Sequence, residues 1–141
     1  MFLLDTDHLS ILHRHQQPEW SRLTSRLANH RPEEAAVSIV SYQEQVQGWL
    51  TYINRAKKDA EIVEGYRQLQ TVFEEYRNFK ALALDQSAQT HFVNLRRQKV
   101  RIKTMDLRIA SIALVHDATV LTRNIRDFSK VPGLKVEDWT R

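Results

Sequence analysis

The sequence predicts an α/β protein in which helices cover both faces of a mostly parallel sheet. Along the 141 residues, short apolar stretches of strand length alternate with longer stretches of helical periodicity, an order typical of strand–helix–strand units. Only three glycines and three prolines are present, which disfavours the many tight turns of an antiparallel sheet. The length fits one domain, which we expect to span residues 1–141.

The composition is that of a globular protein, with 42% hydrophobic and 27% charged residues. The first apolar run ends at Asp5 and no run approaches the roughly 18 residues of a membrane span, so no signal peptide or membrane contact is expected. A cytoplasmic protein is the simplest interpretation. The lack of cysteine excludes a disulfide scaffold, a thiolate zinc site and a cysteine nucleophile. A net charge of +4 favours an anionic partner, either nucleic acid or an acidic protein.

The first predicted strand, Phe2–Leu4, is a short apolar run typical of a fully buried strand. Asp5 follows directly, and a helix is predicted over residues 7–15 with Thr6 or Asp7 as its N-cap. Ligands of open α/β sheets bind beyond the carboxyl ends of the strands. We therefore expect Asp5 at the functional edge of the sheet.

A second helix is predicted after Pro18, and a second strand over residues 36–40, where β-branched residues predominate. Ser41 is a favourable N-cap for the helix that follows. Glu44, three residues later, completes a capping-box pattern. Two long helices with apolar stripes then form a predicted helical hairpin at about residues 42–79.

The remaining predicted elements repeat the strand–helix alternation. They are a strand at 81–84, a helix at 85–97, a helix from Thr104, a strand at 118–121 and a short last strand at 134–136. The helix from Thr104 is apolar on nearly all sides and is expected to be buried. Residues 96–103 form the densest basic stretch, and such a run is more often a solvated surface than a binding site.

Four acids are expected to meet at the carboxyl edge of the sheet. Asp5 ends the first strand, Glu44 lies in the first turn after the second strand, and Asp127 follows the fourth strand together with Asn124. Asp106 lies in the first turn of the buried helix. Such carboxylates repel each other unless a cation neutralises them, and oxygen ligands without a His/Cys cluster suit Mg²⁺ or Mn²⁺. Ions held in this way activate water for phosphodiester hydrolysis.

These acids also have structural interpretations. Asp106 is favoured by the helix dipole whatever the function, and Glu44 could serve only the capping box. Asp127 could be a turn residue beside the core aromatic Phe128. The six histidines show no metal-ligand spacing, so we interpret them as surface or packing residues.

Four segments together resemble the PIN-domain ribonucleases, in particular the VapC-type toxins of bacterial toxin–antitoxin systems. They occur in the same order and cover nearly the whole chain. The segments are residues 3–7 (Leu-Leu-Asp-Thr-Asp), 38–44 (Ser-Ile-Val-Ser-Tyr-Gln-Glu), 105–110 (Met-Asp-Leu-Arg-Ile-Ala) and 121–139, which begins Leu-Thr-Arg-Asn.

The resemblance implies a three-layer α/β/α PIN-like domain with a central, mostly parallel sheet. It also implies a carboxylate-bound Mg²⁺ or Mn²⁺, cleavage of single-stranded RNA (often tRNA), inhibition by a cognate antitoxin, and a homodimer. Asp5, Glu44 and Asp106 match the first three acids of the family. On this basis Asp5 and Asp106 hold the principal ion, Glu44 orients or deprotonates the attacking water, and Asp127 supports a second ion.

Two positions depart from the family pattern. Asn124 stands where many members have an acid, so either Asp127 takes over that role or the second ion is weakly held. Asp7 replaces a common Asn and could take over part of the ligation, and Thr122 would position water or metal. The basic residues expected to bind the RNA backbone near this edge are Arg108, Arg123 and Arg126.

Two other functions fit part of the sequence. Asp5 and Asp7 after a buried strand resemble the opening of haloacid-dehalogenase-type phosphatases, although Leu9 stands where that family has Thr or Val and no later Lys and acid pair is evident. A PIN-like scaffold that binds RNA or protein without catalysis is the second alternative, and Asn124 supports it. In either case the hairpin at 42–79 forms an antitoxin or dimer surface, or packs on the core.

Overall fold

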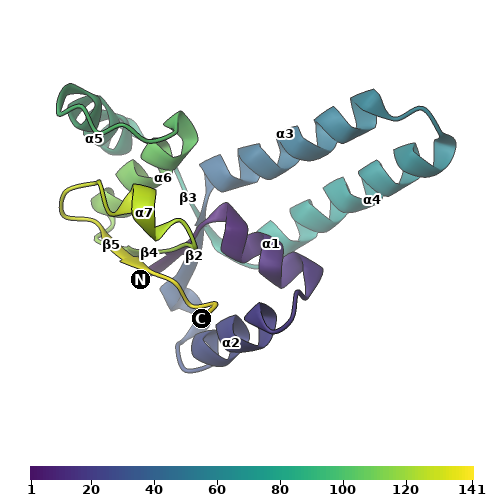
Figure 1. Ribbon diagram of the computed structural model, residues 1–141, viewed down its shortest axis with the longest axis horizontal. Coiled ribbons are helices and arrows are strands. Elements are labelled where there is room, and N and C mark those ends of the chain that lie inside the picture. Colours follow the sequence, from purple (N-terminus) through teal and green to yellow (C-terminus); the bar gives the residue numbers. More distant parts are fainter.

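A five-stranded sheet forms the centre of the molecule in a computed structural model that describes residues 1–141. The strand order is β3-β2-β1-β4-β5 (Figure 1), and every neighbouring pair is parallel. The prediction of a parallel sheet is therefore confirmed. The strands are β1 (Phe2–Leu4), β2 (Ala35–Ser38), β3 (Lys80–Leu82), β4 (Thr119–Leu121) and β5 (Lys135–Glu137).

Helices cover both faces of this sheet, which confirms the three-layer α/β/α architecture. They are α1 (Thr6–Arg14), α2 (Glu19–Leu27), α3 (Ile39–Arg55), α4 (Asp59–Tyr76), α5 (Gln86–Arg97), α6 (Thr104–Val115) and α7 (Ile125–Phe128), with a 3₁₀ turn at Pro32–Glu34. None of these helices combines the length and the apolar character needed to cross a lipid bilayer.

The alternation of side chains along the strands divides the core into two clusters. Leu3 of β1 and Val120 of β4 face one cluster, which α5, α6 and α7 cover. Leu4 and Leu121, the next residues along the same strands, face the other cluster, which includes residues of α1, α2 and α4. All four are fully buried, as expected for a parallel sheet with helices on both faces.

The boundary between β2 and α3 differs from the prediction. The strand ends at Ser38, and the helix begins at Ile39. Ser38, not Ser41, is the N-cap, because its hydroxyl accepts a hydrogen bond from the Ser41 N–H at 2.9 Å. The β-branched residues Ile39 and Val40 suggested a longer strand, but this cap outweighs their weak local preference. The predicted capping box at Ser41 is wrong, which leaves Glu44 free of any capping role.

Other boundaries differ by one or two residues. Asp5 itself caps α1, because its carboxylate accepts from the Thr6 N–H. The helix α6 begins at Thr104 as predicted, and the side chain of its N-cap residue, Lys103, makes no capping hydrogen bond. β3 ends at Leu82 rather than residue 84. Asp85, predicted as the first residue of a helix, is the N-cap of α5, which begins at Gln86.

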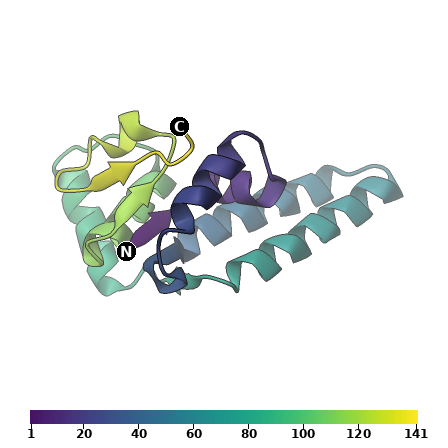
Figure 2. The same cartoon turned by 90° about the horizontal axis from the view of Figure 1, so that it is seen from below.

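The helices α3 and α4 form an antiparallel hairpin that extends well beyond the sheet (Figures 1 and 2). The predicted hairpin is confirmed, but its apolar stripes are only partly buried. Val72 and Tyr76 belong to the core, whereas Tyr66 and Phe73 of the same helix are 58% and 55% exposed. Since Phe73 stands between Val72 and Tyr76 in the sequence, the exposed aromatic residues occupy the face of α4 that turns away from the core.

Replacing Gly65 by Ala is expected to destabilise the hairpin, because a methyl group there would lie 2.5 Å from Ile53 Cγ1 and 3.1 Å from Tyr52 Cδ1. Overpacking of this kind costs about 1–3 kcal/mol. Gly48, also helical, has nothing within 4 Å of the same position, so Gly48→Ala should stabilise by about 0.5–1 kcal/mol. Urea unfolding checks both variants, and equal stabilisation by the two would contradict the close packing at Gly65.

Candidate active site

Two strand ends bring polar side chains together at the carboxyl edge of the sheet. Asp5 follows β1, and Thr122 follows β4, its direct neighbour. The Asp5 N–H donates to the Leu121 carbonyl at 3.0 Å, which continues the pairing of these strands by one residue. The N-termini of α1 and α3 lie at the same edge (Figure 1). This is the edge at which parallel α/β sheets bind ligands.

Asp5 is almost completely buried, with 6% of its surface exposed. One carboxylate oxygen accepts from the Thr6 N–H at 2.7 Å, and the other accepts from the Thr122 hydroxyl at 2.8 Å. Both oxygens are therefore held in fixed positions. A carboxylate so constrained is well suited to be a metal ligand, since its orientation is determined before any ion binds.

Asp7 connects the start of α1 to the loop after β4 through hydrogen bonds. Its Oδ2 accepts from the Thr122 hydroxyl at 3.2 Å and from the Arg123 N–H at 2.9 Å. Its Oδ1 lies 2.7 Å from Nδ1 of the fully buried His8. The Trp139 N–H donates to His8 Nε2 at 3.3 Å, so Nδ1 carries the proton and donates to Asp7. This role of His8 was not predicted, because a contact with residue 139 leaves no local pattern in the sequence.

Glu44 faces the same edge from the second turn of α3. Its Oε1 accepts from the Thr6 hydroxyl at 3.1 Å, and the residue is half-buried. Since Ser38 caps the helix, the side chain of Glu44 is not occupied with the backbone of its own helix. Thr6 thus links two predicted site residues, with its N–H on Asp5 and its hydroxyl on Glu44.

Asp106 and Asp127 belong to α6 and α7, which cover the face of the sheet opposite to α1. Asp106 lies half-buried in the first turn of α6. Asp127 accepts from the Asn124 side-chain amide at 3.1 Å and from the Lys130 ammonium at 3.4 Å. The Asn124 N–H in turn donates to the Thr122 hydroxyl at 3.0 Å. Asn124 therefore connects Asp127 to the residue that binds Asp5.

Three of the four acids have raised pKa values, first because they are buried and second because other carboxylates lie near them. Burial, reinforced by the charges of Asp7 and Asp106, raises the pKa of Asp5 to about 7. Burial and the Asp106 charge raise the pKa of Glu44. Burial also raises the pKa of Asp106, with contributions from Asp127 and Asp7. The Asn124 hydrogen bond instead holds the pKa of Asp127 below its usual range.

These acids fit a divalent cation by their chemistry. No three His, Asp or Glu side chains form a ready-made metal cluster in this structure. Nevertheless, three neighbouring acids resist ionisation, partly because of one another's charges. A bound cation would remove that repulsion, and an all-oxygen set with little histidine suits Mg²⁺ or Mn²⁺.

The predicted RNA-binding residues differ in their surroundings. Arg123 and Arg126 are exposed next to Asn124 and Asp127. Arg108 instead places its guanidinium over the Phe92 ring, 5.6 Å from the centroid, against α5. The positive charge of Lys103, which was not predicted as a site residue, attracts the carboxylates of both Glu44 and Asp106. In the sequence, only its position at the end of the basic stretch 96–103 pointed to such a role.

Taken together, these features define an α/β/α protein with an acidic site at the carboxyl edge of a parallel sheet. The PIN domain family model matches residues 2–134. The chain therefore belongs to the PIN domain family.

Named relatives agree with this assignment. The chain is 40% identical to ribonuclease VapC1 of Rickettsia felis over 43 residues, which are 30% of this chain and 32% of that protein. VapBC-1 from nontypeable Haemophilus influenzae superposes with a TM-score of 0.77 at 20% identity, covering 99% of this chain and 98% of the other. VapBC2 from Rickettsia felis, bound to a DNA fragment from its promoter, superposes with a TM-score of 0.74 at 20% identity over 98% of both chains. The two structures share the fold, whereas the VapC1 match spans about a third of that protein.

Proposed function

We propose that this protein is a metal-dependent endoribonuclease that cleaves single-stranded regions of RNA and acts as the toxin of a toxin–antitoxin pair. The observation that carries the proposal is Asp5, which is held by two hydrogen bonds and whose pKa is raised by burial and by the neighbouring acids Asp7 and Asp106. Perturbed, interacting acids at a ligand-binding edge are typical of catalytic sites. Family membership and the local similarity to a named ribonuclease support the same function.

In this proposal Asp5 and Asp106 hold the principal Mg²⁺, for which Mn²⁺ can substitute. When bound, the ion supplies charge for the developing oxyanion and lowers the pKa of water. Glu44, whose pKa is raised by burial, orients the attacking water and takes its proton. Asp127 supports a second ion or its water shell. Three of these acids resist ionisation in the absence of a cation, which is consistent with the scheme.

The surrounding polar residues position these acids. Thr122 donates to Asp5 and Asp7 and accepts from the Asn124 N–H. Asn124 binds Asp127 rather than replacing it. Asp7 is engaged by Thr122, Arg123 and His8, so we assign it a positioning role rather than direct ligation.

An antitoxin protein is the partner that the structural relatives suggest, because two of them are described as VapBC assemblies. The hairpin offers a suitable apolar surface. Ile39, Tyr42, Phe73 and Tyr76 line a cavity of about 300 Å³. We propose that antitoxin contact and homodimer formation both use exposed parts of this hairpin.

The alternatives receive less support. The later Lys and acid pair of a haloacid-dehalogenase-type phosphatase are not evident in this sequence, and the family model that matches the chain is that of the PIN domain. A purely binding module would have no need of three acids with raised pKa values. Incubation of the protein with total tRNA and Mg²⁺ or Mn²⁺ tests the proposal. EDTA-sensitive cleavage is expected, and a protein that neither cuts the RNA nor binds the metal ion would instead be the binding module.

Divalent ions are also expected to raise the melting temperature, and more so at pH 8 than at pH 5.5. At the lower pH protons occupy Asp5, whose pKa is about 7, and compete with the ion. At 100 times its dissociation constant, the ion would stabilise by about 2.7 kcal/mol. Thermal denaturation with and without Mn²⁺ measures this. A shift of equal size at both pH values would argue against ligation by Asp5.

A further inference from the structure

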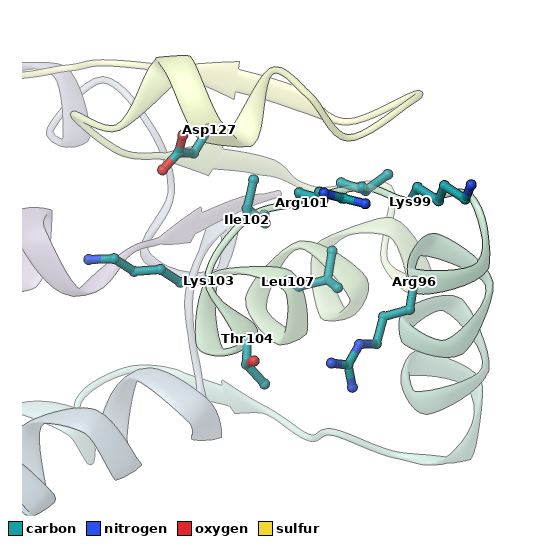
Figure 3. A pocket seen from close by; sticks show the side chains of 9 residues that line it. Arg96, Lys99, Arg101, Ile102, Lys103, Thr104, Leu107 and Asp127 are labelled. Carbon is teal, nitrogen blue, oxygen red and sulfur yellow. The ribbon is translucent and has the colours of Figure 1, made fainter.

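A basic cleft opens beside the acidic site, between the end of α5 and the start of α6 (Figure 3). Its volume is about 610 Å³. Four basic side chains, Arg96, Lys99, Arg101 and Lys103, line it, together with Asp127 of the acidic site. In Figure 3, Lys103 extends in the opposite direction from Lys99.

The local sequence explains why the charges face outward. The helix α5 ends at Arg97, and Lys99 adopts a left-handed conformation (φ 59°) that reverses the chain. The segment that follows alternates in exposure. Val100 and Ile102 pack against the core cluster, while Arg101 is exposed between them. The apolar residues thus anchor the segment, and the basic residues are directed to the cleft.

None of these four side chains forms a salt bridge within the protein. The Lys and Arg ion pairs involve other residues, namely Arg26, Arg31, Arg67, Lys130, Lys135 and Arg141. One of them joins Lys130 to Asp127 at the wall of the cleft. The Arg96 guanidinium lies over the Phe92 ring, 5.3 Å from the centroid. Four unpaired cations around one cleft repel each other, so an anion that binds there gains their combined attraction.

The cleft is continuous with the acidic site. Asp127 and Lys103 both line it, and Lys103 directly precedes the first turn of α6, which carries Asp106. An anionic chain lying in the cleft would therefore have its next units at the acids. Only three of the nine lining residues are hydrophobic, which suits a phosphate backbone better than a protein segment with apolar anchors.

We propose that this cleft binds the phosphate backbone of the RNA strand on one side of the phosphate that is cut. The inference rests on the proposed function. It assigns a role to the basic stretch 96–103, whose simplest interpretation from sequence was a solvated surface. It also makes the cleft, rather than Arg108 on the Phe92 ring, the main electrostatic contact with the substrate.

The test is the salt dependence of RNA binding by a variant with two charges removed, Lys99→Gln together with Arg101→Gln. Both residues are exposed. The matched control is Arg55→Gln with Lys57→Gln, two exposed residues near the tip of the hairpin. Fluorescence anisotropy with a labelled single-stranded RNA in EDTA measures binding without cleavage, and circular dichroism verifies that each variant is folded.

Each phosphate contact contributes about 0.7 to the slope of log K against log salt for a single strand. The cleft variant should therefore lose about 1.4 from the slope and bind about 25-fold more weakly at 0.1 M salt. The control should bind like the wild type. Arg101→Glu, a charge reversal, should weaken binding by more than Arg101→Gln.

Three outcomes would overturn the inference. These are unchanged RNA binding by the cleft variant, equal losses in the cleft and control variants, and binding of poly-L-glutamate as tight as that of an RNA of equal charge. The last would indicate an acidic protein segment instead. The tRNA cleavage assay is separate, so loss of cleft binding in a protein that cuts no RNA would refute the proposed nuclease and leave the cleft as an RNA-binding surface.

Discussion

Replacing Asp5 by Asn is expected to lower metal-dependent RNA cleavage by about 100-fold or more. Removing a residue that supports a metal ligand without binding the metal itself typically lowers metal affinity or activity about 10- to 100-fold. Asp5 is proposed as a direct ligand, so a larger loss is expected. The Asn side chain has nearly the same shape and retains an oxygen for the Thr6 N–H, so the cap of α1 is preserved. Initial cleavage rates at saturating Mn²⁺ measure the effect.

The control for this prediction is Asp59→Asn. Asp59 is exposed at the start of α4, in the tip of the hairpin, and its replacement removes one negative charge without touching the site. Its cleavage rate should match that of the wild type. An Asp5→Asn variant that is folded and cuts at a tenth of the wild-type rate or faster would refute the assignment of Asp5 as a ligand.

The second large effect is on stability. The pKa of Asp5 rises from 3.8 in the unfolded chain to about 7 in the folded protein, so the folded state binds this proton more tightly. The ionisation of Asp5 has almost no effect on the free energy of unfolding below pH 4, and it lowers that free energy increasingly as the pH rises to about 7. Above pH 7 it levels off at a cost of about 4 kcal/mol. Without metal, the protein should therefore lose stability as the pH increases.

Urea unfolding in EDTA at pH 4.5 and pH 8 tests this linkage. Glu44 and Asp106 have raised pKa values as well and change stability in the same direction, so the comparison uses the Asp5→Asn variant. The wild type should lose about 3 kcal/mol more than the variant between the two pH values. The variant should consequently be the more stable protein at pH 8. Parallel pH profiles for the two proteins would contradict a raised pKa at Asp5.

The fold was predictable because local patterns determine it. The apolar strands at Phe2–Leu4 and 118–121, each followed by polar residues, imply a parallel sheet with a functional edge. The structure has this arrangement, with both strands paired in register. The position of Asp5 followed from the same reasoning, since an acid directly after a buried strand has only the sheet edge available.

The β2–α3 junction was not predictable, because two serines competed for the same role. Both Ser38 and Ser41 are suitable N-caps, and the adjacent Ile39 and Val40 favour a strand. The structure selects Ser38, which lets Glu44 bind Thr6 instead of the helix backbone. The local preferences of these residues oppose one another, and in the folded chain the Ser38 cap and the burial of Val40 in the core favour the helix together.

The sequence by itself thus determined the α/β class, the sheet edge and Asp5, because these depend on periodicity and on the order of elements. Tertiary structure alone decided how the site is assembled. The contact of His8 with Trp139 and the attraction of Lys103 for Glu44 join residues far apart in the chain. So does the hydrogen bond from Thr122 to Asp5. Such pairings depend on how the elements pack in three dimensions, and no local pattern in the sequence encodes them.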